Sequence, residues 1–294
     1  MTHITEHKRI PLIGIGGCSM SGLASILKNR GYYVQGSDRA ESPFTERLKE
    51  LGVPVFIGHD VKNIGDCDLI IFSAAIKSDN VERAEAKRRG IPELERSEAL
   101  GQLTEGYESV VGIAGCHGKT TITSMLALIC EQGGPDATVH IGGFVDFLNG
   151  GVRLGAHDMF ITEACEYVES FLTLRPTIAL INNIDNDHLD YYGDMEHIVA
   201  AFKKFAALLP ENGLLIGNTD DFRVRALMAE HTGRKLSYGM KDADYTPANI
   251  TYDDNGCPGF DIMFRGEKLM HIQLRIPGEH SVMNAIAAAA GGGG

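Results

Sequence analysis

The sequence lacks an apolar run approaching the ~20 residues of a membrane-spanning helix, and its N-terminus, MTHITEHKRI, lacks the apolar core of a signal peptide. Basic residues are also scarce: 27 Lys and Arg face 39 Asp and Glu, for a net charge of -12. A general nucleic-acid binder needs clustered basic side chains to neutralise phosphates. We therefore expect no membrane span and no nucleic-acid partner. A nucleotide pocket remains open, because it needs only one or two cations and backbone dipoles.

A disulfide framework is not indicated either. The cysteines show no C-x-x-C pair and no regular spacing; they are Cys18, Cys67, Cys116, Cys130, Cys165 and Cys257. We interpret them as reduced, mostly buried thiols of a cytoplasmic protein. Cys116 is either an alkylation-sensitive thiol or a small filler. With 294 residues, 44% of them hydrophobic and 22% charged, the chain is expected to be globular, with about two domains.

The first hundred residues alternate short apolar segments with segments of helical spacing. This alternation predicts a parallel sheet with right-handed crossovers. The expected strands are Ile10–Ile15, Tyr32–Val34, Val53–Ile57 and Leu69–Phe72, and the expected helices are Met20–Lys28, Pro43–Leu51 and Asn80–Arg89. A polar break around Leu100–Glu108 then divides the chain into predicted domains 1–104 and 105–294.

A second α/β pattern follows the break. The expected strands are Val110–Ala114, Met159–Thr162, Ile178–Asn182 and Leu214–Gly217, and the expected helices are Thr120–Cys130, Glu196–Leu208 and Asp221–Glu230. Alternation from Tyr245 to Ile276, with turns at 254–256 and 265–266, predicts an antiparallel meander at the domain edge. A last helix, Val282–Ala290, runs into Gly291–Gly294. Four glycines offer neither a cap nor a packed end, so we expect a truncation point or an added tail there.

Residues 112–121, GIAGCHGKTT, form the most informative segment. An expected strand, a glycine-rich turn and a helix would surround phosphates with backbone N–H groups and the positive end of the helix dipole. Lys119 would reach the β/γ oxygens, and the Thr120 hydroxyl would reach Mg²⁺. The strict pattern requires Gly where Ile113 stands, and the form present is G-x-x-G-K-T, Gly115–Thr120. A chance Gly-Lys-Thr turn is the alternative.

A second glycine-rich turn, GIGGCSMSG at residues 14–22, lies between the first expected strand and the first expected helix. Such a turn lets a pyrophosphate approach the backbone, and Asp38, after the next strand, could bind a ribose or a base edge. The dinucleotide fingerprint would need Gly where Ser19 stands, so an NAD-dependent dehydrogenase is only weakly indicated. A purely structural tight turn is the alternative.

Polar clusters follow two expected strands of the second domain, TEACE at 162–166 and NNIDNDH at 182–188. The carboxyl ends of parallel strands face the ligand crevice, and Mg²⁺ prefers one or two carboxylates beside nucleotide oxygens. Glu163 is nearer the strand and is the favoured ligand, whereas Glu166 is either a further ligand or a solvated loop charge. His188 lies at the same predicted edge as Lys119, which favours a metal or phosphate role over a structural one.

The last motif is PGEHSVMN at residues 277–284, which opens the final expected helix. His280 and Asn284 are spaced i and i+4, so they share one helix face. Such a pair can hold an adenine or a ribose. A helix cap combined with a surface amide is the alternative.

Taken together and in this order, these motifs resemble those of the Mur ligase family of peptidoglycan assembly. The matching stretches are IGIGGCSMSGLA, GSD (Gly36–Asp38), SAAI (Ser73–Ile76), GCHGKTT, EACEYVESFLTLRPTIALINNIDNDHLDYY and PGEHSVMNA. The family's phosphate loop also has the G-x-x-G-K-T form. The resemblance implies an α/β protein in which a Rossmann-like N-terminal domain binds the UDP-sugar. A P-loop α/β central ATPase domain with an antiparallel edge meander would follow.

The resemblance also implies roles for single residues. The UDP-sugar site would be lined by Gly14, Gly16, Gly17, Ser19, Met20, Ser21, Ser37, Asp38 and Ser73. ATP would be contacted by Gly115, His117, Gly118, Lys119, Thr120, Thr121, Asn183, His280 and Asn284. The catalytic residues would be Lys119, Glu163 and His188, and Mg²⁺ would be held by Thr120, Glu163 and His188. Ser281 stands where many relatives have Asn.

The implied activity is ATP- and Mg²⁺-dependent ligation of L-alanine to the lactoyl carboxylate of UDP-N-acetylmuramate in the cytoplasm, with a homo-oligomer left open. Mur ligases carry a third, C-terminal domain, which would begin where this chain stops. We therefore expect this form to bind its ligands but to ligate poorly. The alternatives are a murein-peptide ligase, which adds a preformed peptide, and a non-catalytic UDP-sugar-binding module. Leu172–Ile184 fits the alanine-adding branch better.

Overall fold

The computed structural model describes residues 2–156 and 158–293, and the chain falls into two compact units. The first unit comprises Met1–Tyr107 and Thr138–Ala156, and the second comprises Glu108–Ala137 and His157–Gly294. The boundary after Tyr107 falls within the expected break, Leu100–Glu108. Thr138–Ala156, however, falls within the predicted domain 105–294 and yet groups with the first unit. The compact units are therefore interleaved along the chain, which the sequence patterns did not indicate.

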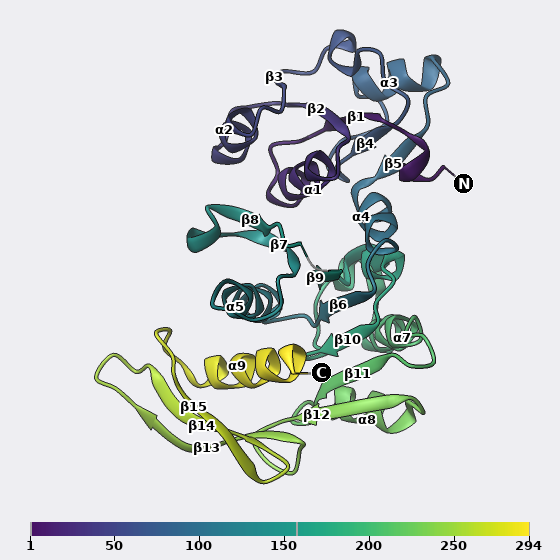
Figure 1. Cartoon of the computed structure of the whole chain (residues 1–294). Helices are drawn as coiled ribbons and strands as arrows, with labels where there is room; N and C mark the ends of the chain where they lie inside the picture. Colours follow the sequence, from purple (N-terminus) through teal and green to yellow (C-terminus); the bar gives the residue numbers. More distant parts are fainter. Residues whose placement is uncertain (1, 157, 294) are drawn as a thin grey trace. The chain divides into compact units, whose positions relative to one another are not determined.

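The first unit is built on a parallel sheet with the strand order β3-β2-β1-β4-β5 (Figure 1). The strands are β1 (Arg9–Ile13), β2 (Tyr33–Asp38), β3 (Val55–Ile57), β4 (Ile70–Phe72) and β5 (Glu93–Glu95). The helices are α1 (Cys18–Asn29), α2 (Pro43–Glu50), α3 (Val81–Arg88) and α4 (Arg96–Thr104), with short 3-10 turns at η1 (Ile4–Glu6) and η2 (Val61–Ile64). The predicted alternation and parallel pairing are confirmed, with shifted ends.

Helix α4 occupies much of the segment that was predicted to be a polar break. It begins with a capping box in which the Glu95 carboxylate accepts from the Ser97 N–H and the Glu98 carboxylate accepts from the Glu95 N–H. Leu100 and Leu103 are buried on one side of the helix. The first part of the expected break is therefore helical up to Thr104, because Leu100 and Leu103 recur at helical spacing and are buried.

A hairpin from the middle of the chain completes the first unit. Its parts are β7 (Thr138–Val145), η3 (Asp146–Leu148) and β8 (Gly150–Arg153), and the strands pair antiparallel. The hairpin packs on α1, where an added Cβ on Gly22 would lie 3.0 Å from Cδ2 of His140. The absence of a side chain at Gly22 therefore lets a β-strand approach the helix closely.

In the second unit the strand order is β15-β14-β13-β12-β11-β10-β6-β9. The strands are β6 (Ser109–Ala114), β9 (Met159–Ala164), β10 (Ile178–Ile181), β11 (Leu214–Asn218), β12 (Arg234–Tyr238), β13 (Tyr245–Tyr252), β14 (Pro258–Phe264) and β15 (Glu267–Gln273). Strand β6 pairs in parallel with both β9 and β10. The predicted meander is confirmed as the antiparallel strands β13, β14 and β15. Strand β12 was not predicted.

The helices of the second unit are α5 (Lys119–Glu131), α6 (Leu189–Tyr192), α7 (Met195–Ala206), α8 (Phe222–Glu230) and α9 (Glu279–Gly292), and η4 (Tyr167–Thr173) is a kinked 3-10 segment. Within residues 2–156 and 158–293, no helix has both the length and the apolarity to cross a bilayer. The predicted positions of α5, α7 and α8 are confirmed, with ends shifted by a few residues.

Helix α9 packs beside α5 (Figure 1) and continues to Gly292, beyond the expected end at Ala290. Gly291 is buried, and an added Cβ there would lie 3.4 Å from Cδ1 of Leu180. The expectation that these glycines offer no packed end was wrong for Gly291. A small residue is what fits between α9 and its neighbours at this point.

The core between η4 and α7 gives a test of packing in the second unit. Phe171 stacks on Phe205 with ring centroids 4.8 Å apart, and Phe205 is fully buried. We expect Phe205→Ala to lower the free energy of unfolding by about 3–5 kcal/mol, because it removes a ring and leaves a cavity. Urea denaturation followed by circular dichroism measures this change. Phe222→Ala, at a ring that is 60% exposed, is the matched control and should change stability by about 0.5 kcal/mol at most.

Candidate active site

The phosphate-type loop lies between the end of β6 and the start of α5, as predicted. Gly118 takes the position before the first helical residue with a left-handed φ of 86°. An added Cβ on Gly118 would lie 2.5 Å from Nδ2 of Asn182 and 2.7 Å from Oδ1 of Asn284. A side chain here would be strained by the φ angle and would force the two amides to shift. The first turn of α5 thus begins at a glycine, with no side chain to compete for its N–H groups.

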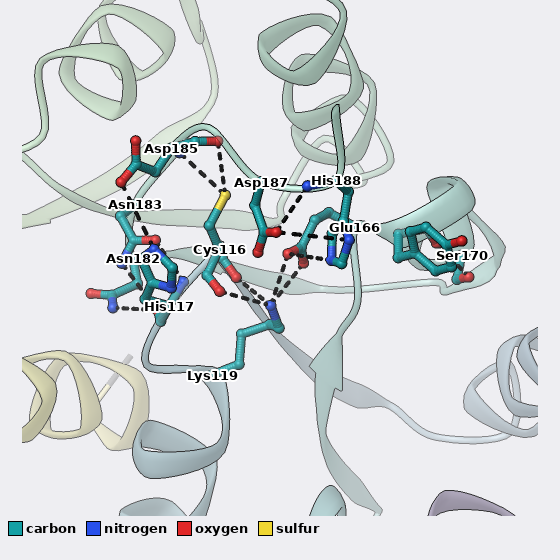
Figure 2. Close-up of polar contacts among 12 residues, drawn as sticks. Cys116, His117, Lys119, Glu166, Ser170, Asn182, Asn183, Asp185, Asp187 and His188 are labelled. Carbon is teal, nitrogen blue, oxygen red and sulfur yellow. Dashed lines mark hydrogen bonds and ion pairs between the residues drawn. The ribbon is translucent and has the colours of Figure 1, made fainter. Parts of the chain in front are cut away.

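Two asparagines after β10 hold this loop from one side (Figure 2). Asn183 accepts from the His117 N–H at 2.8 Å, and both Asn182 and Asn183 donate to the His117 carbonyl, at 2.9 and 3.0 Å. The buried Tyr238 hydroxyl donates to Oδ1 of Asn182 at 2.7 Å. The Asn183 side chain, predicted to contact the nucleotide, is therefore hydrogen-bonded to the loop itself. The Asn182 side chain is held in place by the Tyr238 hydroxyl.

Cys116 is packed inside the loop. Its Sγ lies 3.3 Å from the Asp185 carbonyl oxygen and accepts from the Asp185 N–H at 3.2 Å. Burial raises the pKa of the Cys116 thiol to about 11. Of the two interpretations offered for Cys116, the buried filler fits this environment, and the alkylation-sensitive thiol does not.

Lys119, the first residue of α5, forms an ion pair with Glu166 (Figure 2). Its Nζ lies 2.8 and 3.0 Å from the two carboxylate oxygens, and it also donates to the carbonyls of Gly115 and Cys116. Glu166 is only 1% exposed. The interpretation of Glu166 as a solvated loop charge was wrong, because the chain after β9 turns inward and buries this carboxylate against the lysine.

Glu166, Asp187 and His188 form a group that could hold a metal ion, with one ligand atom from each within 4.8 Å of the others. Nε2 of His188 lies 3.9 Å from Oε1 of Glu166. Of the predicted metal ligands, His188 belongs to this group. Glu163 lies on β9 opposite Ile113, and Thr120 lies on the exposed first turn of α5.

The backbone around this group is strained. Val168, Glu169 and His188 all have left-handed φ angles, of 47°, 56° and 54°. Such conformations cost about 1–3 kcal/mol each for residues other than glycine, and they persist only where neighbours enforce them. Here the Tyr192 hydroxyl donates to the Glu166 carbonyl, and the Tyr167 ring lies 4.6 Å from the His188 ring.

The last motif divides between two environments. Asn284 is buried on α9, and its Oδ1 lies 2.7 Å from where a Cβ on Gly118 would be. His280 is exposed on the first turn of the same helix. The other predicted ATP-contacting positions, Thr121 and His117, lie on α5 and in the loop.

The glycine-rich turn of the first unit is held by Asp38. Its Oδ2 accepts from the Gly16 N–H at 2.8 Å, and the Gly14 N–H donates to the Ser37 carbonyl at 2.8 Å. An added Cβ on Gly16 would lie 2.9 Å from Cγ of Asp38. Asp38 was predicted to face a ligand, but one of its oxygens fixes the turn. Gly17 follows as the exposed residue before α1.

Several side chains predicted to line the first-unit site are buried. The Ser37 hydroxyl donates to Glu82, which is fully buried and also lies 3.2 Å from Nδ1 of His59. Met20 and Ser21 are buried on α1. The contacts of these three residues with the UDP-sugar stay a prediction. Ser73 lies beside Gly14, within 3.2 Å of where a Cβ would be.

Ser19 is held by two residues that sequence reasoning missed. Its hydroxyl lies 3.2 Å from Nε2 of His140 and accepts from Nη1 of Arg96 at 3.2 Å. Burial lowers the pKa of His140 to about 4, so the imidazole is neutral at pH 7. Neither residue belongs to a recognisable motif, and only the folded contacts reveal them.

The chain belongs to the Mur ligase family. The family model described as the Mur ligase middle domain matches residues 113–292, and the one described as the Mur ligase family catalytic domain matches residues 9–108. The chain is 46% identical over 291 residues to a protein of Alkaliphilus metalliredigens named UDP-N-acetylmuramate–L-alanine ligase. The match covers 98% of this chain but only 63% of that relative.

Solved structures support the same relationship. The UDP-N-acetylmuramate-alanine ligase of Thermotoga maritima superposes with a TM-score of 0.83 at 28% identity, covering 97% of this chain and 64% of that one. The UDP-N-acetylmuramate:L-alanyl-γ-D-glutamyl-meso-diaminopimelate ligase of Neisseria meningitides superposes with a TM-score of 0.85 at 26% identity, covering 97% and 92%. The predicted α/β fold is therefore confirmed.

The buried thiol gives a chemical test of the loop. We expect iodoacetamide at pH 8 to modify Cys116 on the order of a hundredfold more slowly than an ordinary exposed thiol, because so little thiolate is present. Mass spectrometry of the Cys116 peptide measures the rate, with the urea-unfolded chain as the reference. Labelling of the folded and unfolded chains at equal rates would contradict the buried environment.

His140 gives a pH test of the first unit. A histidine whose pKa falls from 6.5 to about 4 on folding stabilises the folded state above pH 6.5, and this stability is lost as the pH falls toward 4. Relative to His140→Gln, which cannot titrate, the wild-type chain should lose on the order of 3 kcal/mol more between pH 7 and pH 4. Urea denaturation at each pH measures both. Parallel losses in the two proteins would show that His140 does not titrate in this window.

Proposed function

We propose that this chain carries the nucleotide- and UDP-sugar-binding parts of a ligase that joins L-alanine to the lactoyl carboxylate of UDP-N-acetylmuramate. The observation that carries the proposal is the site around Lys119. There a glycine loop, a helix start and a lysine lie beside the buried Glu166 and His188, in a chain 46% identical to a relative of that name. The chain spans 63% of that relative's length, so the activity is proposed for the longer protein.

Lys119 would neutralise the charge of the ATP phosphates, and the free N–H groups of α5 would face the same anion. Glu163, His188 and the Thr120 hydroxyl are proposed as metal ligands, and the buried position of Glu166 adds that residue to the set. Carboxylate oxygens fit the preference of Mg²⁺, which when bound would offset charge on the β- and γ-phosphates. His280 and Asn284 are proposed to contact adenosine.

The proposed reaction has two steps. A lactoyl carboxylate oxygen attacks the γ-phosphorus of ATP, the bond to the bridging oxygen of ADP breaks, and an acyl phosphate forms. The amine of L-alanine then attacks the acyl carbon, inorganic phosphate leaves, and the amine loses a proton. Phosphoryl transfer of this kind needs in-line positioning and charge neutralisation more than covalent protein chemistry. Lys119 is the chain's own contribution to that neutralisation.

The UDP-sugar is proposed to bind at the turn of the first unit. The backbone of Gly14, Gly16 and Gly17 and the side chains of Ser19 and Ser73 are the groups proposed to contact it. Arg96, which donates to Ser19, adds a positive charge next to the start of α1. Charge of this sign suits a diphosphate.

The 294-residue chain is expected to bind these ligands and to ligate poorly. Amide ligation through an acyl phosphate needs a site that excludes water and holds the amine, and such sites are commonly completed by closure of a further element. Calorimetry with UDP-N-acetylmuramate and with ATP, followed by an L-alanine ligation assay, tests this. Efficient ligation by this chain would contradict it.

Lys119→Ala is the direct test of the proposed phosphoryl step. In the protein extended to the length of its relatives, we expect the rate of phosphate release to fall by on the order of 10²–10³ or more, because a preorganised charge on the transferred phosphoryl group is lost. Lys203→Ala removes an equivalent charge from an exposed pair with Glu230 and is the matched control. Near-normal ligation by Lys119→Ala would refute the assigned role.

The likeness to the Neisseria structure favours one second candidate, a ligase that adds a preformed peptide to the same sugar nucleotide. The same assay separates the two when L-alanine is replaced by L-alanyl-γ-D-glutamyl-meso-diaminopimelate. Turnover with the peptide alone would favour the second candidate. Sugar-nucleotide binding without turnover of either amine would favour a non-catalytic binding module.

A further inference from the structure

We propose that Glu166 is a positioning residue. In the nucleotide-free site its ion pair holds the Lys119 side chain, and exchange of this ion pair couples nucleotide binding to metal binding. The inference rests on the proposed function, because it assumes that the loop takes the phosphates of ATP. From the sequence, Glu166 could be either a further metal ligand or a solvated loop charge. The basis for the proposal is the ion pair between Nζ of Lys119 and the two oxygens of Glu166, at 2.8 and 3.0 Å.

The lysine has no spare hydrogen-bonding capacity in this arrangement. An ammonium group has three N–H donors. Nζ of Lys119 already faces both Glu166 oxygens and the carbonyls of Gly115 and Cys116, which together are more acceptors than it has donors. A phosphate oxygen can therefore bind Lys119 only if one of these partners is given up. Glu166 is the charged partner and competes most directly with an anion.

When Lys119 leaves, Glu166 loses its counter-ion, which has a free-energy cost of its own. Its side chain is buried, and a buried carboxylate without a counter-ion is strongly destabilising. Asp187 and His188 already lie within reach of the same carboxylate. A divalent cation shared by these three residues would replace the departed ammonium. Metal binding and nucleotide binding should therefore favour each other, because each relieves the cost of the other.

The backbone that carries Glu166 is constrained. The Tyr192 hydroxyl donates to the Glu166 carbonyl, and the two following residues with positive φ, Val168 and Glu169, constrain the chain after it. Lys119, by contrast, is attached to the helix through four flexible methylenes. The exchange is therefore made by the lysine, while Glu166 stays beside Asp187 and His188.

The test is ATP binding to the 294-residue chain by calorimetry, with EDTA and again with Mg²⁺. In EDTA we expect Glu166→Gln to bind ATP on the order of tenfold more tightly than wild type, because Lys119 is no longer held by a charge. The gain in affinity on adding Mg²⁺ should be smaller for Glu166→Gln by a similar factor. A merely structural role for Glu166 would weaken binding in both buffers.

Asp187→Asn is the matched control for charge. It removes one negative charge from the same group but leaves the contacts of Lys119 intact. If only the overall charge of the site matters, the two variants should gain equal ATP affinity in EDTA. If the ion pair with Glu166 holds Lys119 away from the phosphates, the gain in ATP affinity for Glu166→Gln should be several times larger. Glu230→Gln, in an exposed lysine pair, should leave ATP affinity unchanged in both buffers.

Four outcomes would count against the inference. Glu166→Gln that binds ATP no better than Asp187→Asn in EDTA, or that keeps the full Mg²⁺ enhancement, would overturn it while leaving the proposed function in place. A wild-type chain that binds no ATP in either buffer would overturn the proposed function and the inference with it. If Glu166→Gln does not melt cooperatively, Glu166→Asp should show the same changes at smaller size, and no change there would overturn the inference.

Discussion

The site depends on the close approach of backbone and amides at Gly118. The left-handed turn there brings Asn182 and Asn284 to within 2.5 and 2.7 Å of where a Cβ would be, so a side chain at this position would displace both amides. The end of β10 and helix α9 thus each place an asparagine beside the phosphate-type loop. Lys119 leaves the backbone directly after this glycine, at the first position of α5.

The two units fix their glycine-rich turns by different means. In the first unit a carboxylate does so, since Asp38 accepts from the Gly16 N–H. In the second unit neutral amides hold the loop, and the carboxylate of Glu166 forms an ion pair with Lys119 instead. The strained backbone at His188 lies next to this charged group, where a conformational cost is tolerated because neighbouring contacts enforce it.

Sequence patterns predicted those strands, helices and turns that are determined by residues close together in the sequence. Apolar runs such as Val110–Ala114 marked buried parallel strands, and the Gly-Lys-Thr turn marked the loop between β6 and α5. The placement of the β7–β8 hairpin, the burial of Glu166 and the inward turn of Ser37 depend on contacts between distant segments. No periodicity encodes these contacts, so Glu166 could be recognised as charged but not as buried or paired.

The position of Asn284 beside the loop has a consequence for biogenesis. The loop follows β6, near the start of the second unit, yet one of the side chains that encloses it comes from the last helix. During synthesis the glycine turn leaves the ribosome long before its partner exists. Contacts so distant in sequence form slowly, because a long intervening segment must be ordered first. Nascent chains that end before α9 therefore lack one of the two asparagines that lie against the glycine turn.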